Sequence, residues 1–335
     1  MMLTIDTLKM VQPTVVKQVQ SLYERERIVH AYLFEGDKGT GKSQVAQFFI
    51  QLLLCEQVEH NEPCLQCRQC KLVMSGNHTN VHHIYPDGAS IKIEQVRNLM
   101  KEMKMVGREE GRKFYVIHNA DKMNIAAANM LLKFLEEPVG KVTAILLTEH
   151  YQAILPTILS RCQHFKFAAL PREVIIAQLT SEQVTKSMAA TVSLLTNDLE
   201  EALALSNDEQ FVQMRKTVLH LIGTIQQNVQ ESLLYIQEAW IPVYKEKQDF
   251  ERALDLLLFA YRDIVALKAD IEGTVVAFPD KEEEFKNIAL RSTYERLSKQ
   301  MQAILKAREQ LHRNMNRSLL MEQLMLNLQE GYAFV

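Results

Sequence analysis

Residues 36–43 constrain this chain more than any other feature. They read Gly-Asp-Lys-Gly-Thr-Gly-Lys-Ser and fit the pattern G-x-x-x-x-G-K-[ST] at every position. An apolar segment, residues 31–35, precedes the pattern, and a helix is expected over about residues 42–54. In such a turn, backbone N–H groups surround phosphates, and the N-terminus of the following helix adds a partial positive charge. The sequence therefore predicts a strand, a phosphate loop and a helix in that order.

The pattern gives its residues separate roles. We expect Lys42 to reach the β- and γ-phosphates of a nucleotide and Ser43 to bind Mg²⁺. The glycines let the backbone curl around the phosphates, and they are Gly36, Gly39 and Gly41. ATP or ADP could therefore bind here. The alternative is a glycine-rich turn that arose by chance.

Hydrolysis of ATP also needs an acidic site at the end of a neighbouring strand. The matching strand is expected at 114–118, and the two positions that would require carboxylates hold His118 and Asn119. Asp121 follows and is expected to cap the next helix. A phosphate loop without its acidic partner indicates nucleotide binding at most, without efficient hydrolysis.

Strand and helix patterns alternate up to about residue 170, where the strand signal stops. A further apolar strand is expected at 142–148, with helices at 93–105 and 124–137. This alternation is typical of a parallel sheet covered by helices on both faces. The predicted fold is therefore an α/β P-loop domain followed by two all-α domains. The expected bounds are 1–170 for the first domain, 171–206 for a small helical lid and 207–335 for a domain of long helices.

The composition narrows the functional classes. With 38 Lys and Arg against 41 Asp and Glu, the formal net charge is −3, which argues against a generally basic coat for nucleic acid. The apolar stretch at 254–267 carries charged residues and is too short to span a bilayer. The N-terminus shows no targeting segment, so we expect a cytoplasmic protein with reduced thiols and no membrane contact.

Four of the five cysteines fall within residues 55–70. Their spacing is C-x8-C-x2-C-x2-C, and they are Cys55, Cys64, Cys67 and Cys70. Four thiolates suffice for a closed tetrahedral Zn²⁺ site, whose metal would be structural because no coordination position stays open. We therefore predict a zinc knuckle over residues 55–70. Free or buried thiols are the alternative, and a redox pair is less favoured because it would not need four cysteines.

Several motifs of the first domain occur together in one known family. In chain order they are His-Ala-Tyr-Leu-Phe at 30–34, the phosphate loop, the cysteine knuckle, Ala-Asn-Met-Leu-Leu-Lys-Phe-Leu-Glu-Glu-Pro at 128–138 and Leu-Pro-Thr-Ile-Leu-Ser-Arg-Cys at 155–162. This set resembles bacterial clamp-loader subunits of the AAA+ class, which are related to replication factor C, and it covers the whole first domain. The segment 254–263 resembles the collar domain of the same family.

Two departures from the family's motor subunits indicate a member that does not hydrolyse ATP. His118 and Asn119 stand where the motor carries Asp-Glu, and Glu200 stands where it carries a sensor arginine. A carboxylate that faces a γ-phosphate would repel it. The alternative within the family is the ATP-hydrolysing motor subunit, of the gamma or tau kind. A zinc-dependent nucleic-acid-binding protein is a third interpretation.

The resemblance also implies partners. The expected role is that of a stator in a pentameric, ATP-driven complex that opens the sliding clamp and places it on primed DNA during replication. The expected partners are the other loader subunits (gamma or tau, and delta), contacted through the collar and the AAA+ faces. The sliding clamp and primed DNA would be contacted as part of the complex.

Arg161 is the residue to which the resemblance assigns catalysis. In this family the arginine of the Ser-Arg-Cys motif acts in trans, as a finger toward the γ-phosphate of ATP on a neighbouring subunit. An interface or intradomain salt bridge is the alternative. Thr148 takes the sensor position after the strand at 142–148 and could be only structural. The fifth cysteine, Cys162, belongs to the same motif and needs no metal role.

Overall fold

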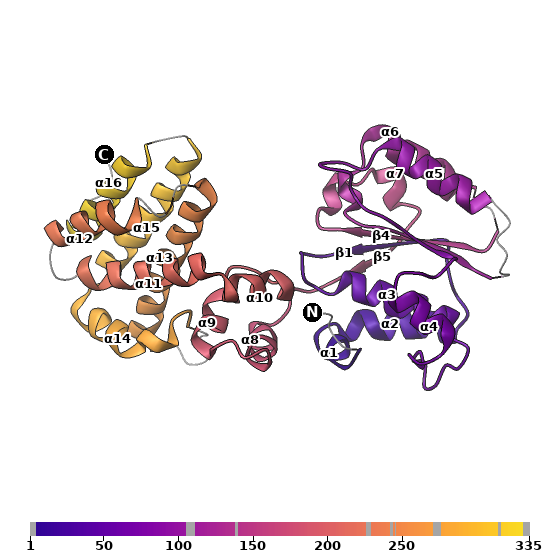
Figure 1. The fold of residues 1–335 in the computed structure, drawn as a ribbon, viewed down its shortest axis with the longest axis horizontal. Helices are drawn as coiled ribbons and strands as arrows, with labels where there is room; N and C mark the ends of the chain where they lie inside the picture. The colour runs from indigo at the N-terminus through magenta and orange to yellow at the C-terminus, as the bar shows by residue number, and fades with distance from the viewer. Residues whose placement is uncertain are drawn as a thin grey trace. The chain divides into compact units, whose positions relative to one another are not determined.

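The chain divides into two compact units, Met1–Pro171 and Arg172–Val335. We describe each unit by itself, from a computed structural model of the chain (Figure 1). The structure describes residues 5–104, 111–137, 140–225, 229–241, 244, 246–270, 276–313 and 316–330.

A five-stranded parallel sheet forms the centre of the first unit. The strands are β1 (Ala31–Glu35), β2 (Val81–Ile84), β3 (Lys113–Ile117), β4 (Val142–Thr148) and β5 (Gln163–Lys166). Their order across the sheet is β2-β3-β4-β1-β5. All seven residues of β4 are buried, because this strand lies between β3 and β1 and helices cover both faces of the sheet. The strands predicted from the apolar segments are confirmed as β1, β3 and β4.

Strands β2 and β5 were not predicted, and both lie at the edges of the sheet. Each has only four residues, Val-His-His-Ile in β2 and Gln-His-Phe-Lys in β5. An edge strand has a partner on one side only, so it keeps polar side chains at the surface. A short polar strand of this kind has no apolar run that a sequence pattern could detect.

Helices cover both faces of this sheet (Figure 1). On one face lie α1 (Ile5–Val11), α2 (Pro13–Glu24), α3 (Lys42–Leu54) and α4 (Arg68–Met74). On the other face lie α5 (Ile93–Lys104), α6 (Ile125–Glu136) and α7 (Pro156–Leu159). The buried core on the α5–α6 face includes Tyr115, Leu131 and Phe134. The covered parallel sheet confirms the predicted α/β class.

The N-terminal cap of α6 differs from the prediction. Asn124 is the cap, because its side chain accepts a hydrogen bond from the N–H of Ala127 at 2.8 Å. Asp121 does not cap α6, since it lies within the short 3₁₀ helix η1 (Ala120–Lys122). The prediction for Asp121 is therefore wrong, and its carboxylate bonds elsewhere, as described below.

In the described residues of the second unit, every regular element is a helix. Three short helices come first, α8 (Arg172–Ser181), α9 (Lys186–Val192) and α10 (Leu199–Asn207). The longer part contains α11 (Glu209–Ile225), α12 (Val229–Tyr235), the π-helix η3 (Ile236–Trp240), α13 (Lys247–Lys268), the 3₁₀ helix η4 (Pro279–Lys281), α14 (Glu282–Arg291), α15 (Tyr294–His312) and α16 (Arg317–Glu330). Both groups belong to one compact unit, so a domain boundary between 171–206 and 207–335 stays a prediction.

A buried polar network joins the short helices to the long ones. Arg215 of α11 donates from Nε to the Thr191 hydroxyl of α9 at 2.9 Å and from Nη1 to Asp280 of η4 at 3.1 Å. Thr191 in turn donates to the carbonyl of Ala277 at 2.7 Å. The fully buried Asp263 of α13 accepts the N–H of Ala277 at 2.6 Å, and the adjacent N–H of residue 278 at 3.0 Å. These bonds satisfy groups that would otherwise be buried without partners.

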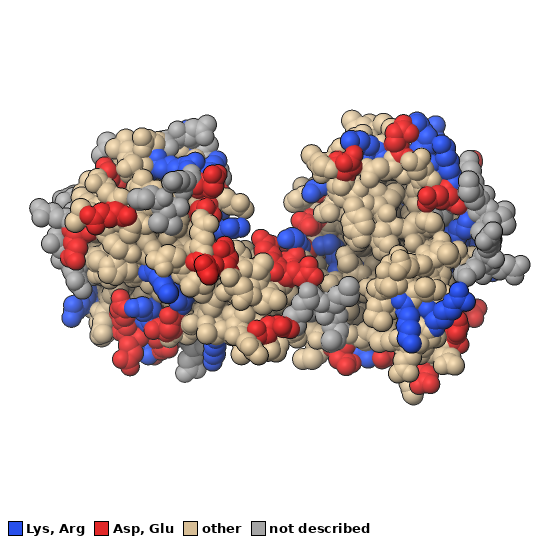
Figure 2. Space-filling view, in the orientation of Figure 1, with Lys and Arg blue, Asp and Glu red and all other residues tan. Residues whose placement is uncertain are grey.

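Positive and negative side chains are interspersed on the face of the molecule that Figure 2 shows. No large area of that face carries Lys and Arg alone. In the part of the chain that the structure describes, no helix combines the length and the apolar content that crossing a bilayer requires.

Candidate nucleotide and metal sites

The phosphate loop connects β1 to α3 and requires glycine at three positions. Gly39 and Gly41 have φ angles of 82° and 87°, in the left-handed region that other residues rarely adopt. At Gly36 the restriction is steric, because a Cβ atom there would lie 2.8 Å from Cβ of Phe167. The N–H of Gly36 also donates to the carbonyl of Thr148 at 3.2 Å, which ties the loop to β4.

Lys42 folds back over the loop that precedes it. Its Nζ donates to the carbonyls of Gly36 at 2.5 Å and Asp37 at 2.6 Å, and the residue is only 9% exposed. Thr40 is fully buried, and its hydroxyl also donates to the carbonyl of Asp37, at 2.8 Å. The ammonium group is thus held at the loop, where a phosphate would meet both its charge and the N-terminus of α3. Ser43 follows in the first turn of α3 and is exposed.

Gln12, which directly precedes α2, also holds the phosphate loop. Its Nε2 donates to the carbonyl of Thr40 at 3.0 Å and to the carbonyl of Ala168 at 2.6 Å. Its Oε1 accepts the N–H of Ala168 at 3.2 Å, and Gln12 is 3% exposed. The clamp that Gln12 forms therefore joins the loop to the segment after β5. The sequence reasoning missed Gln12, because the contact with Ala168 spans 156 residues.

Two histidines lie near the carboxyl ends of β2 and β3, where ATP hydrolysis would require an acidic site. His118 follows β3, and its Nε2 lies 3.1 Å from Nδ1 of His83 in β2. The ring of Tyr85 stacks on His118 with a centroid separation of 4.2 Å. Desolvation of the rings by the side chains packed around them lowers the pKa of His118 to about 4 and, together with the charge of His82, lowers the pKa of His83. Neutral imidazoles are poor ligands for Mg²⁺, which prefers carboxylate and water oxygens.

A cleft of about 440 Å³ opens beside these histidines. Ser43 and Gln47 of α3 line it together with His83 and His118. Its apolar wall comes from the helices and strands around it, and the residues are Ala46, Ile50, Val73, Met74, Val81 and Val116. The edge of the sheet and the start of α3 thus share one solvent-accessible space.

Thr148 is placed next to the loop, with its side chain turned to Asp121. The Thr148 hydroxyl donates to Oδ1 of Asp121 at 2.9 Å, and Thr148 is 1% exposed. The same carboxylate oxygen accepts the N–H of Glu149 at 3.4 Å. The carboxylate predicted to cap a helix therefore fixes the end of β4. Glu200 lies in the other unit, in the first turn of α10.

The structure brings the four predicted metal ligands together. The Sγ atoms of Cys55, Cys64, Cys67 and Cys70 all lie within 4.8 Å of one another. Backbone N–H groups point at the sulfurs, for example Cys64 N to Cys55 Sγ at 3.3 Å and Cys70 N to Cys67 Sγ at 3.4 Å. Burial raises the pKa of Cys67, but N–H donors and neighbouring thiols outweigh it and lower that pKa to about 7. The cluster could hold a metal such as zinc.

Other contacts hold the cysteine segment against the helices of this face. Gln51 of α3 donates to the carbonyl of Cys70 at 3.1 Å. Gln20 of α2 donates to the carbonyl of Asn61 at 3.2 Å. The segment from Cys55 to Cys70 is therefore anchored at two points, Asn61 and Cys70.

Arg161 follows α7, and its side chain is about one-third exposed. Its Nη2 lies 2.8 Å from Oε1 of Glu136, the last residue of α6. Its Nη1 donates to the carbonyl of Thr157 at 2.9 Å and to the hydroxyl of Ser160 at 3.3 Å. The intradomain salt bridge that the sequence offered as the alternative to a finger is thus present, between Arg161 and Glu136. An exposed pair of this kind is worth only about 0–1 kcal/mol, so it does not prevent another anion from competing for the guanidinium.

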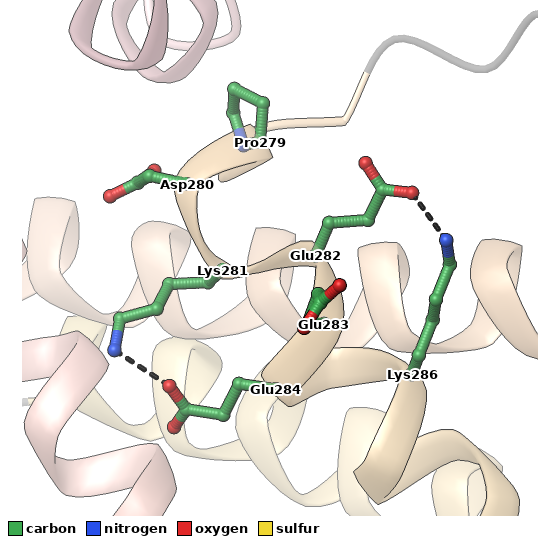
Figure 3. A pocket seen from close by; sticks show the side chains of 7 residues that line it. All are labelled: Pro279, Asp280, Lys281, Glu282, Glu283, Glu284 and Lys286. Carbon is green, nitrogen blue, oxygen red and sulfur yellow. Dashed lines mark hydrogen bonds and ion pairs between the residues drawn. The ribbon is translucent and has the colours of Figure 1, made fainter.

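A second cleft of about 440 Å³ lies at the start of α14 (Figure 3). Its acidic side chains are partly paired with nearby lysines, Glu284 with Lys281 of η4 at 2.6 Å and Glu282 with Lys286 of α14 at 2.6 Å. The cleft is open to solvent, and its charges partly cancel.

Comparison with known proteins shows which family the chain belongs to. The model of the family described as "DNA polymerase III, delta subunit" matches residues 11–171, and that of its C-terminal part matches residues 209–330. The DNA polymerase III subunit delta' of Bacillus subtilis is 40% identical over 320 residues, which are 96% of this chain and 97% of that protein. The chain belongs to the DNA polymerase III delta' family. This membership confirms the resemblance inferred from the motifs.

More distant similarities extend to related proteins. The DNA polymerase III subunit tau of Bacillus subtilis is 26% identical over 87% of this chain and 54% of that protein. Among solved structures, a gamma subunit-related protein of Thermotoga maritima covers 94% of this chain and 98% of that chain, with a TM-score of 0.44 and 17% identity.

Proposed function

We propose that this delta' chain is the stator of a clamp loader and supplies Arg161 to ATP bound on a neighbouring subunit. One observation carries the proposal: the chain presents a surface arginine after α7, while its own sheet edge offers His118 in place of a magnesium-binding carboxylate. A guanidinium can stabilise the charge on a transferring phosphoryl group across an interface. Catalysis would then occur on another chain's nucleotide.

The proposed partners follow from the family. They are the other loader subunits, of the gamma or tau kind and delta, with the sliding clamp and primed DNA reached as part of the complex. The similarity of this chain to subunit tau supports a ring of related subunits. The proposed location is the cytoplasm, where reduced thiols remain available to bind metal.

Replacement of Arg161 in a reconstituted loader tests the finger. Arginine fingers contribute about 10³–10⁵ in turnover, so Arg161→Ala should abolish hydrolysis at the site that faces this subunit, and Arg161→Lys should restore little of it. The matched control is Arg97→Ala, which removes an arginine that pairs with Glu94 on the surface of α5. Assembly, measured by size-exclusion chromatography, should not change. Unchanged single-turnover hydrolysis in Arg161→Ala would refute the finger.

We also propose that the phosphate loop binds ATP or ADP without efficient hydrolysis. The bonds from Lys42 to Gly36 and Asp37 support a formed loop, and the His83–His118 pair supports the loss of Mg²⁺-dependent chemistry. The alternative is an active motor subunit. Sustained ATP turnover by the isolated chain, abolished by Lys42→Ala, would favour that alternative.

Zn²⁺ is the metal that we propose for the four cysteines. In a tetrahedral Zn–thiolate site with bonds of about 2.3 Å, neighbouring sulfurs are about 3.8 Å apart. The observed upper limit of 4.8 Å requires a contraction of no more than about 1 Å. Four thiolates leave no open position, so the ion would stabilise the segment 55–70 and take no part in a reaction.

The third interpretation, a zinc-dependent nucleic-acid-binding protein, makes a different prediction. Chelation would then abolish DNA binding by the isolated chain, whereas a structural ion predicts a loss of thermal stability. The interspersed charges of Figure 2 favour the structural role.

A further inference from the structure

His83 and His118 meet on adjacent parallel strands. In the register of β2 and β3, Ile84 pairs with Ile117, and the N–H of His118 donates to the carbonyl of Ile84 at 2.9 Å. This backbone pairing brings His83 Nδ1 within 3.1 Å of His118 Nε2. Tyr85 stacks on the ring of His118 and helps to fix its orientation. The two nitrogens are therefore held face to face by the sheet itself.

The separation of the nitrogens suits one shared metal ion. Imidazole nitrogens bind Zn²⁺ at about 2.0–2.1 Å, and two nitrogens 3.1 Å apart at that distance subtend about 98° at the ion. This angle lies between the values for square-planar and tetrahedral geometry. In the hydrogen-bonded pair, one proton lies between the two rings. When an ion enters, that proton moves to the remote nitrogen of its own ring, so both facing lone pairs become available.

The ligand type selects the ion. Imidazole suits Zn²⁺, Cu²⁺ and Ni²⁺, whereas Mg²⁺ and Ca²⁺ require oxygen ligands. The rings are also accessible, because His83 is exposed and both rings line the 440 Å³ cleft that Ser43 shares. Two protein ligands leave further coordination positions for water or for a phosphate oxygen.

We propose that His83 and His118 form a second metal site, open to solvent, that binds a divalent transition ion of the Zn²⁺ type at the edge where the motor subunits carry their acidic pair. This site is separate from the four cysteines, and it does not depend on the role proposed for Arg161. It would place a cation beside the phosphate loop through nitrogen ligands.

The chain supplies a matched control on the same strand. His82 is adjacent to His83 and points to the opposite side of the strand, where its Nδ1 lies 3.1 Å from Glu102 Oε2. Replacement of His82 therefore removes an imidazole from β2 and leaves the facing pair intact.

Equilibrium dialysis of the full chain against micromolar free Zn²⁺ tests the proposal. Wild type and His82→Asn should each retain one more zinc per chain than His83→Asn or His118→Asn. This difference in zinc content is one equivalent whether or not the cysteines bind zinc. A cysteine cluster that binds no zinc would therefore lower the zinc content of all four proteins equally and leave the difference unchanged. Excess Mg²⁺ should not displace the additional ion.

Three results would overturn the proposal. They are equal zinc content in all four proteins, equal loss in all three variants, and displacement of the additional ion by Mg²⁺. Circular dichroism of each variant establishes that it is folded. If His118→Asn does not fold, His83→Asn still decides the outcome, because His83 lies exposed at the rim of the cleft.

Discussion

The clamp formed by Gln12 allows a quantitative test of how the phosphate loop is held. Gln12→Ala removes three hydrogen bonds, two to Ala168 and one to the carbonyl of Thr40. A net hydrogen bond contributes about 1 kcal/mol, so the loss should be about 3 kcal/mol. Gln12 makes no side-chain cap to α2, so the helix itself is not weakened by the change.

Hydrogen exchange measured by mass spectrometry reports this loss of stability directly. A loss of about 3 kcal/mol corresponds to about a 100-fold fall in protection, expected for amides of β1 and α3 that exchange through unfolding of the first unit. Amides of α11 and α13, in the second unit, should keep their protection. ATP affinity should fall as well, because the loop loses one of its supports.

Gln18→Ala is the matched control, since Gln18 is an exposed glutamine in α2, the helix that Gln12 directly precedes. It should leave protection unchanged. If protection in Gln12→Ala stays within about threefold of wild type, which is less than 1 kcal/mol, the clamp does not support the loop and the reasoning fails.

Three further predictions concern the loop, the metal and the second unit. ATP at 100 times its dissociation constant should stabilise the first unit by about 2.7 kcal/mol, and Lys42→Ala should remove this effect in a thermal-shift assay. Chelation of zinc should lower protection around Cys70 while the urea transition of Trp240, the only tryptophan in the sequence, stays in place because it reports on the other unit. Asp263→Ala should lower the free energy of unfolding of the second unit by about 2–6 kcal/mol, because two buried N–H groups lose their acceptor, and should move that fluorescence transition to lower urea. Asp263→Asn should cost less, because it keeps an acceptor.

The sequence predicted the central elements of the first unit because their chemistry is local. The apolar runs that became β1, β3 and β4 are buried along most of their length, and burial of that kind leaves a continuous pattern. The spacing of the four cysteines likewise predicted a cluster, since a short segment can bring all four sulfurs together.

Contacts between distant residues could not be predicted in the same way. The pairs His83–His118, Thr148–Asp121 and Arg161–Glu136 depend on which strands and helices become neighbours. The apolar pattern of a single sequence indicates which elements are buried, but it does not give the order of the strands in the sheet. Gln12 is the extreme case, because a polar residue at a helix start gives no sign that it will be buried against residue 168.

The clamp at Ala168 and the network around Arg215 together have a mechanical consequence. One fixes the chain just after β5, and the other makes the short helices a rigid part of the second unit. Between Ala168 and the first residue of α8 only three residues remain, and Pro171 locks one of their φ angles. These three residues, with about five free backbone dihedral angles, are therefore all of the chain that lies between the clamp and α8. A substitution at Gln12 would release the chain immediately before this connection and leave the bonds of Arg215 in place.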